Sequence, residues 1–440
     1  MQARLHAVAA EDGGARDFQR DGFDDYCKRI FPYFDKWRKA YGDTYLYWLR
    51  QRPALYVTDP ELISEIGRCV SLDMGKPKYL QKGQEPIFGA GILKSNGACW
   101  ARQRKAAVDG AKGGAGVAAV EVDADIRSFS FDVISRACFG TDHSRGKEIF
   151  LRLRALSGLM AETSVIFAIP SLRYLPTEKN RRIWKLTQEI RSLILELARG
   201  RRAETAEQRD FLSSIIESSG DQPRPDDFVV DNCKNIFFAG HETSAVTATW
   251  CLMLLAAHPE WQERARAEVL EVCGAAAAEP DFDMVSRMKT LGMVVQETLR
   301  LFPPSSFVVR ETFRDMRLGR LHAPKGTYLF VPISAMHHDA ASWGPTSRRF
   351  DPGRFKDGVA AACKHPQAAF MPFGLGARTC LGQNLANVEV KTLLAVVLAR
   401  FAFTLSPDYR HSPAFRFIIE PEFGLRLLIR RVGATQDGCN

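Results

Sequence analysis

Apolar residues recur every three to four positions over most of the chain, which is the period of an amphipathic helix. This spacing predicts helices over residues 99–108, 122–138, 147–162, 178–200, 209–218, 226–257, 259–273, 284–302 and 382–401. Aromatic and branched residues around a proline-bearing turn predict a hairpin over 45–57, and turn residues within 316–333 predict another small sheet. The pattern therefore predicts a mainly α-helical protein with small β-sheets.

The longest apolar run lies in the second half of the predicted helix 226–257. It covers thirteen residues, from Ala245 to Ala257, which is fewer than the ~20 that a bilayer requires. The amino terminus also lacks an apolar run long enough for a signal peptide or an anchor. We therefore expect a buried helix at 226–257 and a chain that is soluble by itself.

Composition narrows the class further. The 440 residues include 60 Lys and Arg against 51 Asp and Glu, a net charge of +9, and 46% are hydrophobic. These values exclude disordered, collagen-like and disulfide-scaffold proteins. The positive charge suits an acidic partner or a membrane surface, but no nucleic-acid-binding pattern is present. Gly/Ala-rich segments at 110–119 and 274–278 predict loops within one domain spanning residues 1–440.

A glycine-rich loop, residues 373–382, places Cys380 where the predicted helix 382–401 begins. Backbone N–H groups, the helix dipole and Arg378 all favour a thiolate there, and a thiolate can ligate iron. The same residues also fit a nucleophilic or redox-active cysteine, or a buried structural one. A dinucleotide-binding loop is disfavoured, because Gly374 and Gly376 lack a third glycine and a preceding strand.

The loop resembles the haem-binding signature of cytochrome P450, F-x-x-G-x-R-x-C-x-G, which the chain matches at Phe373, Gly376, Arg378, Cys380 and Gly382. The resemblance implies a triangular, mostly helical prism that holds haem b between a long central helix and the Cys-loop helix. Cys380 would be the axial ligand of the iron.

Two further elements resemble the family in the expected order. Glu297-x-x-Arg300 and the later Arg354 match residues that form a buried Glu–Arg–Arg network. The segment 239–244, A-G-H-E-T-S, resembles the oxygen-activation element of the central helix. Its glycine and threonine favour a local opening of that helix. The resemblance assigns Thr243 to orienting water and oxygen, and Glu242 to proton supply.

The resemblance also implies contacts to the haem and a substrate pocket. The expected cofactor-binding residues are Trp100, Arg104, Arg310, Phe373, Arg378 and Gly382. The expected pocket residues are Phe237, Ala239, Ser306, Phe307, Val308 and Val309. One departure concerns the stretch between Arg104 and Ile126, which is shorter than is typical of the family and carries the Gly/Ala loop.

Segments 93–97, 132–140, 173–182 and 237–243 are similar to plant members that oxidise terpenoid hormones. Within that clan, segments 249–261 and 371–378 are similar to the gibberellin-oxidising group. This similarity implies a monooxygenase that uses O2, with NADPH electrons supplied by a cytochrome P450 reductase. The expected reaction on a gibberellin is 13-hydroxylation or 16,17-epoxidation. A full-length form with an amino-terminal anchor, which this chain lacks, would lie on the cytosolic face of the endoplasmic reticulum membrane.

Three alternatives remain open from the sequence. The chain could oxidise another lipid or terpenoid hormone. It could rearrange hydroperoxides without a redox partner, although Glu242 and Thr243 argue against that. It could also bind haem without catalysis, because it is shortened after Arg104.

Overall fold

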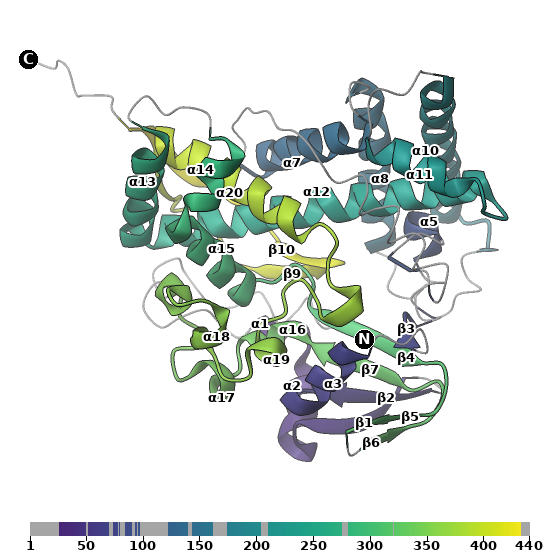
Figure 1. The fold of residues 1–440 in the computed structure, drawn as a ribbon, viewed down its shortest axis with the longest axis horizontal. Helices are drawn as coiled ribbons and strands as arrows, with labels where there is room; N and C mark the ends of the chain where they lie inside the picture. Colours follow the sequence, from purple (N-terminus) through teal and green to yellow (C-terminus); the bar gives the residue numbers. More distant parts are fainter. Residues whose placement is uncertain are drawn as a thin grey trace, which may run out of the picture.

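The computed structural model describes a mainly helical protein with small sheets, as predicted (Figure 1). The described residues are 26–49, 52–69, 74–77, 79, 84–89, 93–94, 96, 122–139, 143–161, 174–203, 210–274, 280–319 and 321–432. The predicted helix 99–108 and the predicted loops at 110–119 and 275–278 lie outside them.

The longer helices follow the predicted ranges closely, except α3, which none of those ranges covers. They are α3 (Pro60–Arg68), α7 (Val122–Phe139), α8 (His143–Ala161), α10 (Glu178–Ala203), α11 (Phe211–Ser219), α12 (Pro225–Ala257), α13 (Pro259–Cys273), α14 (Phe282–Arg287), α15 (Lys289–Leu301) and α20 (Gln383–Arg400). Shorter helical segments are α1 (Tyr26–Ile30), α2 (Pro32–Tyr41), α5 (Glu85–Phe88), α16 (Ile333–His337), α17 (Ala340–Trp343), η3 (Pro352–Phe355), α18 (Val359–Ala362), α19 (Pro366–Ala369) and η4 (Gly376–Arg378).

The predicted helix 284–302 is wrong in one respect, because the structure divides this segment into α14 and α15. The Asp281 carboxylate accepts a hydrogen bond from the Met284 N–H at 2.7 Å and caps α14. Met288 then leaves the helical region with a ψ of 88° before α15 begins. Periodicity alone does not reveal this break, since Met284 before it and Leu291 after it pack against the same core.

The predicted hairpin is β1 (Thr44–Leu49) paired with β2 (Arg52–Val57). The largest sheet has the order β1-β2-β7-β4-β3, with β3 at Met74–Gly75, β4 at Phe307–Thr312 and β7 at Tyr328–Pro332. β5 (Met316–Leu318) and β6 (Leu321–Ala323) form a separate hairpin. The prediction of one sheet over 316–333 is therefore wrong, because β7 pairs with β2 and β4 instead.

Two small antiparallel sheets lie near the carboxyl end of the chain. β8 (Phe401–Leu405) pairs with β11 (Leu427–Arg431), and β9 (Pro413–Arg416) pairs with β10 (Ile418–Pro421). Strand β8 follows directly on α20, which shortens the predicted helix 382–401 by one residue at that end.

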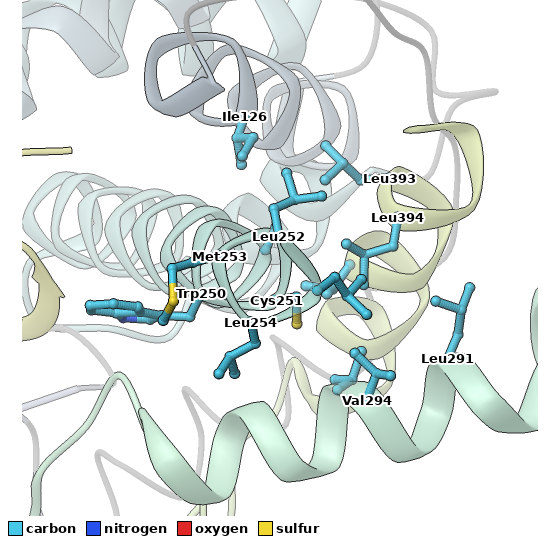
Figure 2. Close-up of a cluster of buried hydrophobic side chains, with 14 of the residues drawn as sticks. Ile126, Trp250, Cys251, Leu252, Met253, Leu254, Leu291, Val294, Leu393 and Leu394 are labelled. Carbon is cyan, nitrogen blue, oxygen red and sulfur yellow. The ribbon is translucent and has the colours of Figure 1, made fainter. Parts of the chain in front are cut away.

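Helix α12 runs through the middle of the helical part of the molecule (Figure 1). Its second half, the apolar run from Ala245 to Ala257, is buried as expected. Figure 2 shows side chains of this run pointing toward α7, α15 and α20, with Ile126, Leu291 and Leu394 among their neighbours. This core fixes α12, which carries Thr243, relative to α20, which follows Cys380.

Helices α7, α8, α10 and α11 form a second buried cluster with the first half of α12. A third cluster joins α3 to the large sheet and includes Met371, just before the Cys380 loop. Among the helices that the structure describes, none combines the length and apolarity needed to cross a bilayer.

Candidate active site

The loop before α20 is closed by its own backbone. The Cys380 N–H donates to the Phe373 carbonyl at 2.7 Å, and the Thr379 N–H donates to the Gly376 carbonyl at 3.0 Å. Gly374 and Gly376 adopt positive φ angles of 79° and 66°, which favour glycine over residues with a Cβ. The Cys380 side chain is exposed at the end of this loop, two positions before Gly382, which caps α20.

Helix α3 supports the loop from outside. A Cβ built on Gly376 would overlap the carbonyl oxygen of Gly67, and a Cβ built on Gly67 would overlap the Leu375 side chain. At residue 376 the close approach to the α3 backbone leaves no room for a Cβ, and at residue 67 the Leu375 side chain fills the space that a Cβ would need. The sequence motif contains Gly376, but nothing in it points to Gly67.

The segment of α12 that resembles the oxygen-activation element is helical without interruption. The Thr243 hydroxyl donates to the Ala239 carbonyl at 2.6 Å, one turn earlier. A Cβ on Gly240 would clash with Ile134 of α7. Gly240 therefore permits close packing of α12 against α7. The local opening that we expected in α12 is not seen in this segment, where the Thr243 hydroxyl instead donates to the Ala239 carbonyl.

Glu242 lies in a network of charges between α7, α12 and β10. The Arg127 guanidinium binds Glu242 and also binds Glu420 at 2.9 Å. The His241 Nε2 lies 2.9 Å from the Arg127 carbonyl, and its Nδ1 lies 3.4 Å from the Glu242 carboxylate. Burial alone would raise the pKa of Glu242, but the His241 hydrogen bond and the Arg127 charge outweigh it and lower the pKa to about 2. Glu242 is therefore a carboxylate at neutral pH.

The structure brings Glu297, Arg300 and Arg354 together, and the side chains of Glu297 and Arg300 are fully buried. Arg300 binds Glu297 with two hydrogen bonds, at 2.7 and 2.8 Å, and Arg354 approaches the same carboxylate at 3.3 Å. The remaining Arg300 donors reach the carbonyls of His337, Ser347 and Arg349. This satisfied network ties α15 to the segment that leads into the Cys380 loop.

Four cationic side chains, Lys76, Lys94, Arg310 and Arg378, gather beside the Cys380 loop. Burial lowers the pKa of Lys94 to about 8, and burial together with Arg378 lowers the pKa of Arg310 to about 10. Burial and the other three cations hold the pKa of Lys76 well below its usual range. A ligand with carboxylates would offset this mutual repulsion.

Asn96 connects two of these cationic residues, Lys76 and Arg378, by hydrogen bonds. Its side-chain amide hydrogen-bonds both backbone groups of Lys76, at 2.7 and 2.9 Å, and accepts from Arg378 at 3.3 Å. Sequence reasoning missed Lys76, Asn96 and Arg127 as site residues. An ion pair of Arg127 could have been predicted. Its side chain lies on a helical face that is otherwise buried, and a buried cation requires a carboxylate partner.

The other expected site residues lie in different surroundings. Phe237 is packed among aromatic rings, 5.9 Å from Phe131 between ring centroids. Val308 lies against Leu375 and Met371, on the side of the sheet that faces the Cys380 loop. Ser306 and Phe307 line a separate cavity together with α1 and α2. Val309 is buried, and its carbonyl accepts a hydrogen bond from Arg310.

Of the remaining expected contacts, Phe373 is partly buried and packs against the α12 core. Trp100 and Arg104 lie outside the described residues.

Comparison with known proteins agrees with this geometry. The family profile of cytochrome P450 matches residues 108–423. The chain is 76% identical to cytochrome P450 714D1 of Oryza sativa subsp. japonica, with 95% of this chain and 81% of that protein covered. It is 48% identical to rice cytochrome P450 714C2 (92% and 84% covered) and 38% identical to Arabidopsis thaliana cytochrome P450 714A2 (91% and 84% covered).

The alignment with cytochrome P450 714D1 spans 465 positions, whereas 95% of 440 residues is about 418, so about 47 aligned positions have no counterpart here. The match over most of the chain and the high identity to these relatives establish that the chain is a haem-dependent monooxygenase of the cytochrome P450 family, within its 714 group.

Proposed function

We propose that this cytochrome P450 inserts one oxygen atom from O2 into a gibberellin acid, by 13-hydroxylation or 16,17-epoxidation. The observation that carries the proposal is the set of segments similar to the gibberellin-oxidising group. They are 249–261, which covers the end of α12 and the start of α13, and 371–378, which leads into Cys380. NADPH electrons would arrive through a reductase, and the positive net charge of the chain favours an acidic partner.

We assign the haem to the space beside Cys380, whose thiolate would hold its iron. The residues present fit such a group on two grounds. The thiol is exposed at the start of a helix, and Lys76, Lys94, Arg310 and Arg378 provide the positive charge that two propionates require. Haem bound there would supply dioxygen reduction, which a thiolate ligand favours by donating electron density.

Thr243 and Glu242, both on α12, would take part in proton delivery to the site. The Thr243 hydroxyl donates to Ala239, so its lone pairs are left to accept a hydrogen bond from a water or from bound substrate. Glu242 is ionised at neutral pH, so it does not store a proton. We propose that Glu242 passes protons on, with His241 and Arg127 holding its carboxylate in place.

A full-length form would act at the cytosolic face of the endoplasmic reticulum, where a membrane-bound reductase is available. This part of the proposal is supported by the resemblance to anchored plant members of the family.

The experiment is a reconstituted turnover assay. Purified holoenzyme, a plant reductase and NADPH are incubated with gibberellin acids under 18O2, and products are identified by mass spectrometry. We expect one 18O atom per product, located at C-13 or at C-16 and C-17. Thr243→Ala should consume NADPH with less product. A holoenzyme that is reduced by NADPH but leaves every gibberellin unchanged would contradict the substrate assignment.

A further inference from the structure

A cavity of about 500 Å³ lies away from Cys380, between α1 and α2 on one side and α16, α17 and the segment 345–349 on the other. Phe307, the first residue of β4, and Ser306 before it also line the cavity. Its volume lies within the range of sites that hold a small organic molecule, roughly 300–1,000 Å³. None of the residues to which we assign haem binding or proton transfer lines it.

One wall of the cavity is aromatic. The rings of Phe31 and Phe307 meet edge to face with centroids 4.6 Å apart, and those of Phe34 and Tyr56 lie 5.0 Å apart. Four rings from α2, β2, β4 and the α1–α2 junction thus form a continuous apolar surface. Such a surface suits a ring system or an alkyl chain.

The cavity lining carries an excess of positive charge. Four cationic residues, Lys28, Arg38, Arg348 and Arg349, line it, against two carboxylates. Both carboxylates have cationic partners, because Arg38 binds Asp339 at 3.2 Å and Lys39 binds Asp35 at 2.9 Å. Arg348 and Arg349 are neighbours in the chain and both line the cavity, so the segment 345–349 brings two positive charges to it.

Two serines in the lining have unsatisfied hydroxyl groups. Ser306 and Ser334 are each 2% exposed, and the Oγ of each has no hydrogen-bond partner among the described residues. A buried hydroxyl without a partner is costly, and a polar atom of a ligand would remove that cost.

From these features we infer that the cavity is a second ligand site for an amphipathic carboxylate. The apolar body of the ligand lies on the Phe31, Phe34 and Phe307 rings, and its carboxylate faces Arg348 and Arg349. Both a fatty acid and a terpenoid acid have this chemistry. The site is separate from the haem site, so its occupancy does not depend on which substrate the enzyme oxidises.

The test uses holoenzyme whose haem iron is already ligated by an azole, which blocks the catalytic site. Equilibrium dialysis then measures binding of radiolabelled laurate and of radiolabelled ent-kaurenoic acid, each against the corresponding alcohol. We expect one molecule of acid per protein in the presence of the azole, and roughly tenfold weaker binding of the alcohol because the charge-assisted hydrogen bonds are lost. Tighter binding of laurate would identify the ligand as a fatty acid, and tighter binding of ent-kaurenoic acid would identify it as a terpenoid acid.

Two variants separate the cavity from the rest of the protein. Arg348→Gln with Arg349→Gln should weaken acid binding about tenfold, since two charge-assisted contacts are removed. Lys356→Gln with Lys364→Gln makes the same change of charge on exposed residues outside the cavity and should leave binding unchanged. Ala335→Phe fills the cavity from α16 without changing charge and should abolish binding.

The haem spectrum of each variant reports whether the protein is still folded, because it does not depend on this cavity. Absence of binding by both acids to azole-ligated enzyme would overturn the proposal. Equal binding of acid and alcohol, or binding unaffected by either cavity variant, would overturn it as well. The gibberellin turnover assay is scored separately, so either proposal can fail without the other.

Discussion

Gly376 of the Cys380 loop and Gly67 of α3 pack backbone against backbone, so closely that a Cβ on Gly376 would overlap the Gly67 carbonyl oxygen. This contact fixes the distance between the loop and α3, and therefore helps to position Cys380. Residue 376 must therefore be glycine for two reasons. Its φ angle is positive, and there is no room for a Cβ.

We therefore expect Gly376→Ala to lower haem content and thermal stability more than Gly374→Ala does. Both glycines have positive φ, so each substitution carries a strain of about 1–2 kcal/mol. Only Gly376→Ala adds a backbone clash, because the nearest atom to a Cβ on Gly374 is the Arg378 carbonyl oxygen at 3.7 Å. Haem content per protein and the thermal midpoint test this. If both variants lowered haem content and the thermal midpoint equally, the contact of Gly376 with Gly67 would have no role in holding the loop.

Glu242 and Glu420 both bind Arg127, but only Glu242 lies next to Thr243 in the chain. Glu242→Gln should slow turnover by roughly a hundredfold, the scale of a lost proton-transfer group, while Glu420→Gln should leave turnover within about threefold. Since the pKa of Glu242 is about 2, its charge should not contribute a step to the pH–rate profile between pH 5 and 8. Steady-state product formation measures both; similar losses in the two variants would indicate a structural role alone.

Glu389 of α20 is buried, and one of its oxygens has no hydrogen-bond partner in the described part of the chain. Burial raises its pKa to about 8, although hydrogen bonds to Ser130 and Ser244 oppose the rise. The folded protein thus keeps a proton that the unfolded chain, with a carboxyl pKa of about 4.3, has lost. Stability should fall as pH rises through this interval, by about 2–3 kcal/mol between pH 5.5 and 7.5.

Glu389→Gln removes this titration and should make the variant more stable than the wild type at pH 7.5, with a smaller difference at pH 5.5. Urea unfolding at the two pH values checks the sign. A variant that is equally destabilised at both values would show that the carboxyl is ionised in the folded protein.

Removal of the Glu297 carboxylate should unfold much of the molecule. Glu297→Ala leaves Arg300 buried without its charge partner and removes a contact of Arg354, and breaking a buried pair in this way costs roughly 3–5 kcal/mol. Glu260→Ala, an exposed carboxylate on α13, is the matched control and should change little. Haem content and circular dichroism report the outcome, and a folded, haem-loaded Glu297→Ala protein would contradict the structural role of the network.

Much of the fold could be predicted from the sequence because helical periodicity persists in α7, α10, α12 and α13. The Cys380 loop and the Glu297–Arg300 pair could also be found, since their residues lie at short, fixed spacings, whereas Arg354 is assigned to the network only by the resemblance to the family. The break at Met288 and the pairing of β7 with β2 could not, because they depend on tertiary contacts.

The same limit applies to the site. Gly67, Lys76 and Asn96 reach it from segments distant in sequence, where no local pattern marks them. The ion pair of Glu242 with Arg127, which together with the His241 hydrogen bond lowers the pKa of the carboxylate, depends on the packing of α7 on α12.

The absorption spectrum of the dithionite-reduced, carbon monoxide-bound protein tests the assignment of Cys380 most directly. A thiolate ligand predicts the strongly red-shifted Soret band that gives the family its name, and Cys380→Ser should lose that band while Cys363→Ser keeps it. A wild-type protein that binds haem without the red-shifted band, or a Cys380→Ser protein that retains it, would contradict ligation by Cys380.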